Sequence, residues 1–193
     1  MALLAAAAVA FVAASLRSPE VPTFVPTDLS VREAGEGLVG PRTFTVDASS
    51  PDRWRFFDFS RGTVVERPGP LEWDVAFRRF QVTVNGGRGF AGRGGVIDLG
   101  AVSFDSVRTV PRDGYMESLA AQDSVNEAIE RWYDYSWTSH LLTPRPSVYA
   151  VRTADGRYAK LHFVGYYCEG AVAGCLTFRY VYQGGGGTDV AAY

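Results

Sequence analysis

The sequence predicts an all-β domain, a mainly antiparallel sandwich or strongly curved sheet with one short helix, behind an N-terminal transmembrane helix. Three observations predict it: short runs that alternate apolar and polar residues from Thr43 onward, glycine-rich turns between those runs, and an uncharged opening segment of 16 residues. Alternation with a period of two is the pattern of half-buried strands. The 193 residues are one ordinary domain's worth of chain, long enough to bury a core.

The opening segment, Met1 to Leu16, is uncharged and rich in alanine. No basic residue precedes its apolar stretch, as one does in a typical secretory signal peptide, although Ala13 and Ser15 form a weak cleavage pattern. As a helix it is about 24 Å long, short of the roughly 30 Å hydrocarbon core. We expect residues 1–17 to be a transmembrane anchor beside other helices, with an uncut signal sequence as the alternative. The residues expected to contact the membrane or those helices are Leu3, Leu4, Phe11, Val12, Leu16 and Arg17.

Residues 18–42 are rich in proline and glycine and have no sustained periodicity, which predicts an extended linker. The net charge of −2 offers no basic face, so nucleic acid is not an expected partner.

The β domain is predicted to span residues 43–183, and its elements follow in order along the chain. Ser124 to Glu127 form a capping box, and the apolar spacing from Val125 to Trp132 predicts the one short helix. Residues 184–193 begin with four glycines and predict a flexible tail. The expected strands are Thr43–Asp47, Trp54–Phe59, Thr63–Glu66, Trp73–Val84 as the longest, Gly95–Leu99, Val148–Thr153, Tyr158–Tyr166 and Leu176–Gln183.

Cys168 and Cys175 are the only cysteines, and six residues with two glycines separate them between two strand-like runs. A disulfide across a hairpin is expected, which places the domain in an oxidising compartment. A pair of free thiols is the alternative. Neither histidine stands at a zinc-ligand spacing from the cysteines, so no metal site is expected.

Little in the sequence supports catalysis. It contains neither GxSxG nor HExxH, and the glycine-rich stretch from Asn85 to Gly95 leads into a strand rather than the helix of a phosphate loop. His162 lies in a predicted strand as a structural residue, whereas His140 lies in a loop. We expect no enzyme activity.

The aromatic residues are more informative about function than the missing catalytic motifs. Trp132, Tyr135 and Trp137 are candidates for contact with a partner or a membrane, because tryptophan and tyrosine anchor both kinds of interface. The tyrosines around the two cysteines are expected to fill the core.

From Thr43 to Tyr182 the chain resembles the HmuY family of haem-binding lipoproteins and secreted haemophores. The resemblance implies an all-β, extracytoplasmic domain. It rests on Val46–Ser49, Trp54 with Phe57–Val65, Trp73–Arg79, Asn85 with the glycine loop, Val110–Tyr115, Val148–Arg152, Asp155–Gly156, Ala159–Lys160 and Gly174–Tyr182.

The best-known members of that family hold haem iron between two axial histidines, and this chain departs from them at both positions. The segment of the first ligand is replaced by the short helix expected from Ser118 to Arg131, and Trp137 stands where the second ligand is expected. His140, three residues further on, is the one candidate substitute. The lipobox cysteine common in the family is missing near the N-terminus.

These departures favour a non-catalytic accessory subunit without a cofactor. We expect it to be anchored in a bacterial inner membrane by a single pass, with its domain on the periplasmic side, in contact with subunits of an integral membrane complex. A weaker resemblance to HmuY-like small subunits suggests a photosynthetic reaction-centre or light-harvesting assembly. The alternative is an extracytoplasmic protein of the HmuY type that binds haem or another tetrapyrrole through His140.

Overall fold

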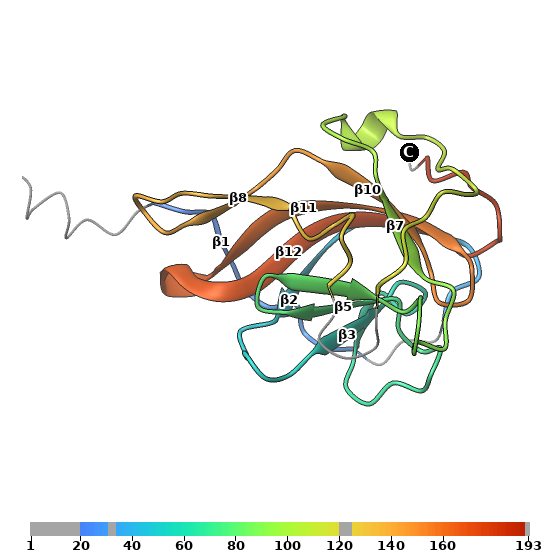
Figure 1. Ribbon diagram of the computed structural model, residues 1–193, viewed down its shortest axis with the longest axis horizontal. Coiled ribbons are helices and arrows are strands. Elements are labelled where there is room, and N and C mark those ends of the chain that lie inside the picture. The colour runs from blue at the N-terminus through green and yellow to red at the C-terminus, as the bar shows by residue number, and fades with distance from the viewer. Residues whose placement is uncertain (1–19, 31–33, 120–124, 192–193) are drawn as a thin grey trace, which may run out of the picture.

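The computed structural model describes residues 20–30, 34–119 and 125–191, and their regular structure is almost entirely β (Figure 1). Two short 3₁₀ helices, η1 (Phe104–Ser106) and η2 (Glu169–Ala171), are the only helical turns assigned in these ranges. The strands form two antiparallel sheets and a separate hairpin, so the predicted all-β class is confirmed.

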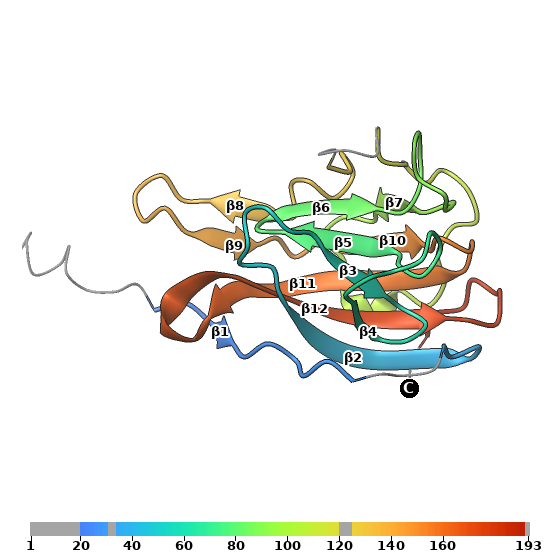
Figure 2. The same cartoon turned by 90° about the horizontal axis from the view of Figure 1, so that it is seen from below.

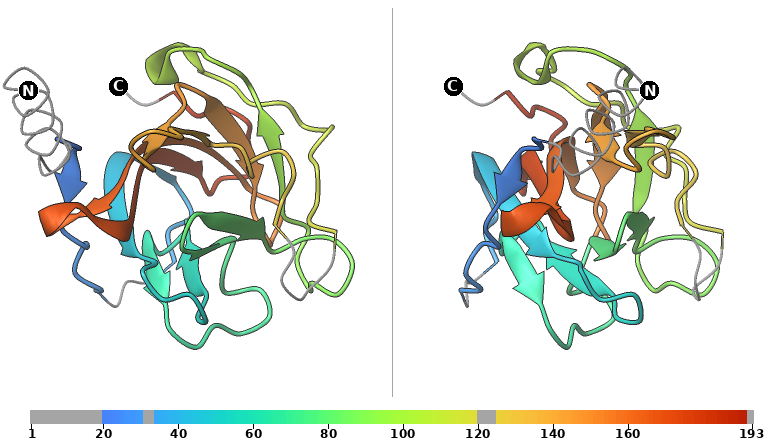
Figure 3. Two further views of the ribbon diagram at one scale, coloured as in Figure 1. Left: turned by 60° about the vertical axis from the view of Figure 1, so that its left-hand side comes forward. Right: turned by 90° about the vertical axis from the view of Figure 1, so that its left-hand side faces the viewer.

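The larger sheet has the order β2-β12-β11-β10-β7, in which all neighbours are antiparallel. The short strand β1 lies parallel to the end of β11, beside the turn that joins β11 to β12 (Figure 3). The bounds of these strands are β1 Thr23–Phe24, β2 Leu38–Asp47, β7 Gly95–Asp98, β10 Val148–Arg152, β11 Tyr158–Cys168 and β12 Val172–Gln183.

The smaller sheet has the order β4-β3-β5-β6 and packs on one face of the larger sheet (Figure 2). Its strands are β3 Arg55–Asp58, β4 Thr63–Val65, β5 Val75–Arg78 and β6 Gln81–Val84. A third pair, β8 Tyr133–Tyr135 and β9 Leu142–Pro144, forms a hairpin of its own.

An aromatic core joins the two sheets. Phe57 of β3 meets Phe178 of β12 edge to face, with ring centroids 5.1 Å apart, and Phe77 of β5 lies 5.4 Å from the same ring. All three side chains are fully buried, and burial of each such side chain stabilises the fold by roughly 1.5–3 kcal/mol. Tyr180 and Tyr182 belong to the same cluster, as the sequence predicts.

The opposite face of the larger sheet is buried too, under loops. Tyr149 and Val151 of β10 point into the aromatic core, whereas Val148 and Ala150 belong to a second cluster with Phe104. Successive side chains of a strand point to opposite faces, so β10 is apolar on both sides.

The segment Trp73–Val84 is predicted as one long strand, and this is corrected to two. Strands β5 and β6 form a tight hairpin that turns at Arg79, whose φ is +55°. The Arg79 amide donates to the Ala48 carbonyl at 2.8 Å, and this hydrogen bond holds the turn against the residue that follows β2. The apolar alternation continues through the turn, so the pattern alone does not reveal it.

The predicted short helix is corrected to a hydrogen-bonded turn over residues 127–131, and Ser124 lies outside the described residues. Asn126 organises this turn: its Oδ1 accepts from the Ala128 amide at 3.1 Å and its Nδ2 donates to the Met116 carbonyl at 2.8 Å. Since Tyr133 already belongs to β8, the chain has room for little more than one turn.

Both flanks of the predicted β domain pack against it. In the predicted linker, the Thr27 amide donates to the Thr45 carbonyl at 2.9 Å, and β2 begins at Leu38. In the predicted flexible tail, the Val190 amide donates to the Arg108 carbonyl at 2.8 Å and Val190 is fully buried. The described parts of both segments therefore differ from the loose chain that their composition predicts.

The predicted transmembrane anchor, residues 1–17, lies outside the described residues. Within the three ranges that the structure describes, no helix has the length and hydropathy needed to cross a bilayer.

Candidate functional site

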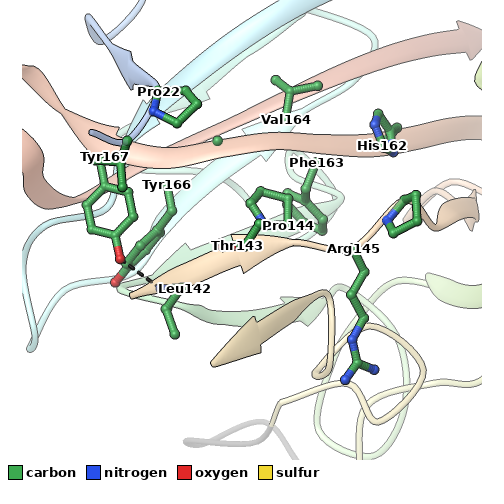
Figure 4. A pocket seen from close by; sticks show the side chains of 13 residues that line it. Pro22, Leu142, Thr143, Pro144, Arg145, His162, Phe163, Val164, Tyr166 and Tyr167 are labelled. Carbon is green, nitrogen blue, oxygen red and sulfur yellow. Dashed lines mark hydrogen bonds between the residues drawn. The ribbon is translucent and has the colours of Figure 1, made fainter. Parts of the chain in front are cut away.

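The hairpin β8–β9 lies against β11 and forms the walls of two hollows. Its register pairs Tyr133 with Pro144 and Tyr135 with Leu142. The Leu142 amide donates to the Tyr167 hydroxyl at 2.8 Å, which ties β9 to β11 (Figure 4). A hairpin fixed in this way leaves a hollow along each of its sides.

The first, which we call the His140 hollow, has a volume of about 560 Å³. That size lies within the range of small-molecule and cofactor sites. Most of its lining is aromatic or aliphatic, with Arg79 as its cationic residue and His140 as its imidazole. The lining residues are Arg79, Phe80, Tyr133, Tyr135, His140, Leu141, Leu142, Tyr166, Tyr167, Ala171 and Ala173.

His140 is exposed and held by two local hydrogen bonds. Its backbone has a φ of +57°, an uncommon conformation outside glycine, and its amide donates to the Ser136 carbonyl at 2.8 Å. Its Nδ1 shares a hydrogen bond with the Tyr135 hydroxyl. The loop therefore presents the imidazole in one orientation, with Nδ1 engaged.

Two phenols of this hollow, Tyr133 and Tyr166, stay neutral at physiological pH. Burial raises the pKa of Tyr166 to about 12, and burial followed by the charge of Glu130 raises the pKa of Tyr133. These two hydroxyls are therefore suited to hydrogen bonding rather than to binding a metal as phenolates. The Arg79 guanidinium donates to the carbonyls of Ser49 and Ala173 at 3.1 and 3.2 Å, which fixes a positive charge at the wall.

The second, which we call the His162 hollow, lies on the other side of the hairpin and has a volume of about 380 Å³. Figure 4 shows His162 on β11, at the upper right of the view, and its Nδ1 lies 2.9 Å from the Ser147 carbonyl oxygen. Neither hollow is lined by both histidines. The two imidazoles therefore do not face one another across a single cavity.

The three aromatic contact candidates lie in different surroundings. Trp132 is fully buried, with its ring 4.6 Å from that of Phe163 and its Nε1 donating to the Phe80 carbonyl at 2.9 Å. Its prediction as a contact residue is corrected, since it belongs to the core. Tyr135 and Trp137 are 41% and 82% exposed, so they remain available for contact. The other contact candidates, Leu3, Leu4, Phe11, Val12, Leu16 and Arg17, lie outside the described residues.

The predicted disulfide between Cys168 and Cys175 is present and closes the turn between β11 and β12. In the described ranges, no group of three or more His, Cys, Asp or Glu side chains is arranged to hold a metal ion.

Sequence reasoning missed the hollow itself. It singled out Tyr135 and His140 separately, although a loop of six residues between β8 and β9 brings the two side chains together. The pairing of Tyr135 with Leu142, which places His140 just beyond the end of the hairpin ladder, is visible only in the structure, because neither strand of this hairpin was predicted. The wall from Tyr166 and Tyr167 comes from a distant part of the chain and has no local signal.

The donor set suits the binding of haem from one side. An imidazole nitrogen is a common axial ligand of haem iron, the aromatic walls suit a flat apolar ring, and Arg79 adds a positive charge to the wall. A clamp of two histidines does not fit, because His162 lines the other hollow.

Comparison with known proteins agrees with the fold and the site. The family model described as HmuY protein matches residues 50–180, well over half of the chain. The chain belongs to the HmuY family. It is accordingly a non-enzymatic protein, as expected from its sequence. No curated protein gives a significant sequence match.

Three solved structures place this HmuY domain among experimentally known folds. A putative HmuY-like haem-binding protein from Bacteroides vulgatus is 26% identical, with a TM-score of 0.59, covering 73% of this chain and 91% of its own. A putative lipoprotein from Bacteroides fragilis is 19% identical, with a TM-score of 0.56 and coverage of 73% and 88%. The apo HmuY analogue of Tannerella forsythia is 18% identical, with a TM-score of 0.56 and coverage of 81% and 99%.

Proposed function

We propose that this HmuY-family chain is a non-catalytic, extracytoplasmic protein that binds haem or a related tetrapyrrole in the His140 hollow. The observation that supports this most is His140 itself, oriented by Tyr135 at the edge of an aromatic hollow of about 560 Å³. The haem-binding description of the relative from Bacteroides vulgatus supports the same ligand class.

His140 would hold the iron through Nε2, since Nδ1 is engaged by Tyr135. A neutral imidazole carries one proton, so Nε2 has a free lone pair only in the tautomer in which Nδ1–H donates to the Tyr135 oxygen. Such a partner fixes the tautomer and the ring orientation of a ligating histidine. Bound haem would supply the iron and its four pyrrole nitrogens.

An extracytoplasmic location accords with the disulfide, which persists in oxidising compartments. It also accords with the lipoprotein description of the relative from Bacteroides fragilis. The uncharged N-terminal segment supports attachment of the chain to a membrane.

Titration of hemin into the full-length chain tests the proposal. We expect a saturable change in the Soret band that His140→Ala abolishes and that His162→Ala, the matched control in the other hollow, leaves in place. Tyr135→Phe should keep the band but weaken binding by roughly 10–100-fold, because it removes the partner that orients the ligand. A Soret change that survives unaltered in His140→Ala would contradict the assignment of this hollow.

A second candidate is the membrane-anchored accessory subunit expected from the sequence. Exposed Tyr135 and Trp137, which offer a contact surface, favour it. The comparisons give no support to a reaction-centre or light-harvesting assembly as the complex. If the chain is an accessory subunit, purification of the full-length chain in mild detergent should retain membrane partners in stoichiometric amounts. Purification as a monomer without partners would contradict this hypothesis.

A further inference from the structure

One end of the molecule gathers three segments that are distant in the sequence. The β8–β9 loop (residues 136–141), the disulfide-closed turn (168–175) and the start of the described chain at Glu20 lie together there, at the left of Figures 1 and 2. The contacts agree, because β1 pairs with Tyr167 and Cys168, and β9 is tied to Tyr167. We call this the hairpin end.

The hairpin end exposes apolar side chains that the fold does not need. Trp137 is 82% exposed, Val172 is 56% exposed and Tyr135 is 41% exposed. Trp137 is nevertheless held in place, since its ring packs edge to face on Tyr135 with centroids 5.2 Å apart, and Tyr135 is bonded to His140. Tyr135 also lines the His140 hollow together with Ala171 and Ala173, the chain neighbours of Val172, so these side chains gather on one surface. A contiguous exposed apolar patch marks an interaction site.

The surroundings favour a bilayer interface over a protein partner. The 19 residues before Glu20, of which the first 16 are uncharged, join the domain at this same end. Tryptophan and tyrosine are the residues that concentrate at membrane–water interfaces.

From these observations we infer that the hairpin end docks on a lipid bilayer, with Trp137 and Val172 inserted at the level of the headgroups. Neither residues 136–141 nor residues 168–175 contain lysine or arginine, and Glu169 is their one carboxylate. Insertion therefore depends on apolar contact and does not require anionic lipid. The hairpin end includes Tyr135 and His140, so docking would place the His140 hollow at the membrane surface. It also sets the orientation of the domain, with β11 and β12 running away from the membrane.

Fluorescence of the full-length, haem-free chain in phosphatidylcholine vesicles tests this. The vesicles carry lipid with a nitroxide either near the headgroup or near the end of the acyl chain. We expect the shallow nitroxide to quench tryptophan emission more than the deep one, and Trp137→Phe to lose most of that quenching, because the three remaining tryptophans belong to the body of the domain.

Two reporters in the Trp137→Phe background serve as matched controls. Val172→Trp stands at the hairpin end and should regain the quenching. Leu38→Trp is also at an exposed site. In β12, however, Gln183 pairs with Leu38 and Cys175 pairs with Asp47, so Leu38 lies roughly 26 Å along the strand from the disulfide-closed turn. It should stay unquenched by lipid.

Circular dichroism of each variant establishes that the fold is retained. Equal lipid quenching of the wild-type chain and Trp137→Phe, with Trp137 still open to aqueous iodide, would overturn the inference. Quenching of Leu38→Trp equal to that of Val172→Trp would also overturn it.

Discussion

Asp74 joins the two sheets through a single buried carboxylate. Its Oδ2 accepts from the Phe59 amide and its Oδ1 accepts from the Ala154 amide, both at 2.8 Å. Ala154 lies in the turn between β10 and β11, so the carboxylate connects the smaller sheet to the larger one. Burial, and next the charge of Asp58, raise the pKa of Asp74 to about 8.

This shift predicts a stability that falls as the pH rises. The unfolded chain releases the Asp74 proton near pH 4, whereas the folded chain keeps it until about pH 8. The folded state therefore binds more protons between these values, and the contribution is fully present below pH ~4 and lost through pH ~8. Urea unfolding of the wild-type chain across this range should show the decline.

Asp74→Asn provides the comparison. It should remove the Asp74 part of that slope, and should lower stability at acid pH by about 1–3 kcal/mol because one of the two amides loses its acceptor. An identical slope in the two proteins would assign the pH dependence to other groups.

Lys160 is a second residue whose surroundings the sequence does not reveal. The only lysine of the chain is 1% exposed, and its Nζ donates to the carbonyls of Phe104 and Val107 at 2.9 and 2.7 Å. Its partners lie more than 50 residues away, so no local pattern shows that the charge is buried.

At the scale of elements, strand β1 depends on one glycine of β11. A Cβ at Gly165 would stand 2.0 Å from Cε2 of Phe24, so any other residue at this position would displace the phenyl ring. The absence of a side chain there is what allows the predicted linker to dock on the sheet.

Gly165→Val should therefore displace Phe24 and loosen β1. We expect faster hydrogen exchange at Thr27, whose amide donates to the Thr45 carbonyl. Gly37→Ala is the matched control, because nothing lies within 4 Å of the added methyl group. Unchanged exchange at Thr27 in Gly165→Val would show that β1 is held by other contacts.

Strands were predictable where a short apolar or alternating run is bounded by turn residues, as in β3, β10, β11 and β12. The predictions failed where the chain turns without interrupting the apolar pattern, as at Arg79, and where a side chain caps a single turn, as at Asn126. Both outcomes depend on distant backbone partners, Ala48 and Met116, which a local pattern does not contain.

At the scale of the whole molecule, the sequence was sufficient for the fold class, the family and the disulfide. It was not sufficient for the two hollows, because each needs the β8–β9 hairpin to pack on β11. It also missed the docking of the C-terminal segment. The glycine-rich composition predicts a flexible tail, but Val190 packs in the second apolar cluster, with Phe104 and Val148.

The separation of His140 and His162 into two hollows is the feature that most distinguishes this chain from a two-histidine haem site. The most direct measurement is the electron paramagnetic resonance spectrum of the full-length chain loaded with ferric haem. Ligation by His140 alone predicts a high-spin signal that His140→Ala changes and His162→Ala does not. A low-spin signal typical of two imidazole ligands, or the lack of any saturable haem complex, would contradict this account.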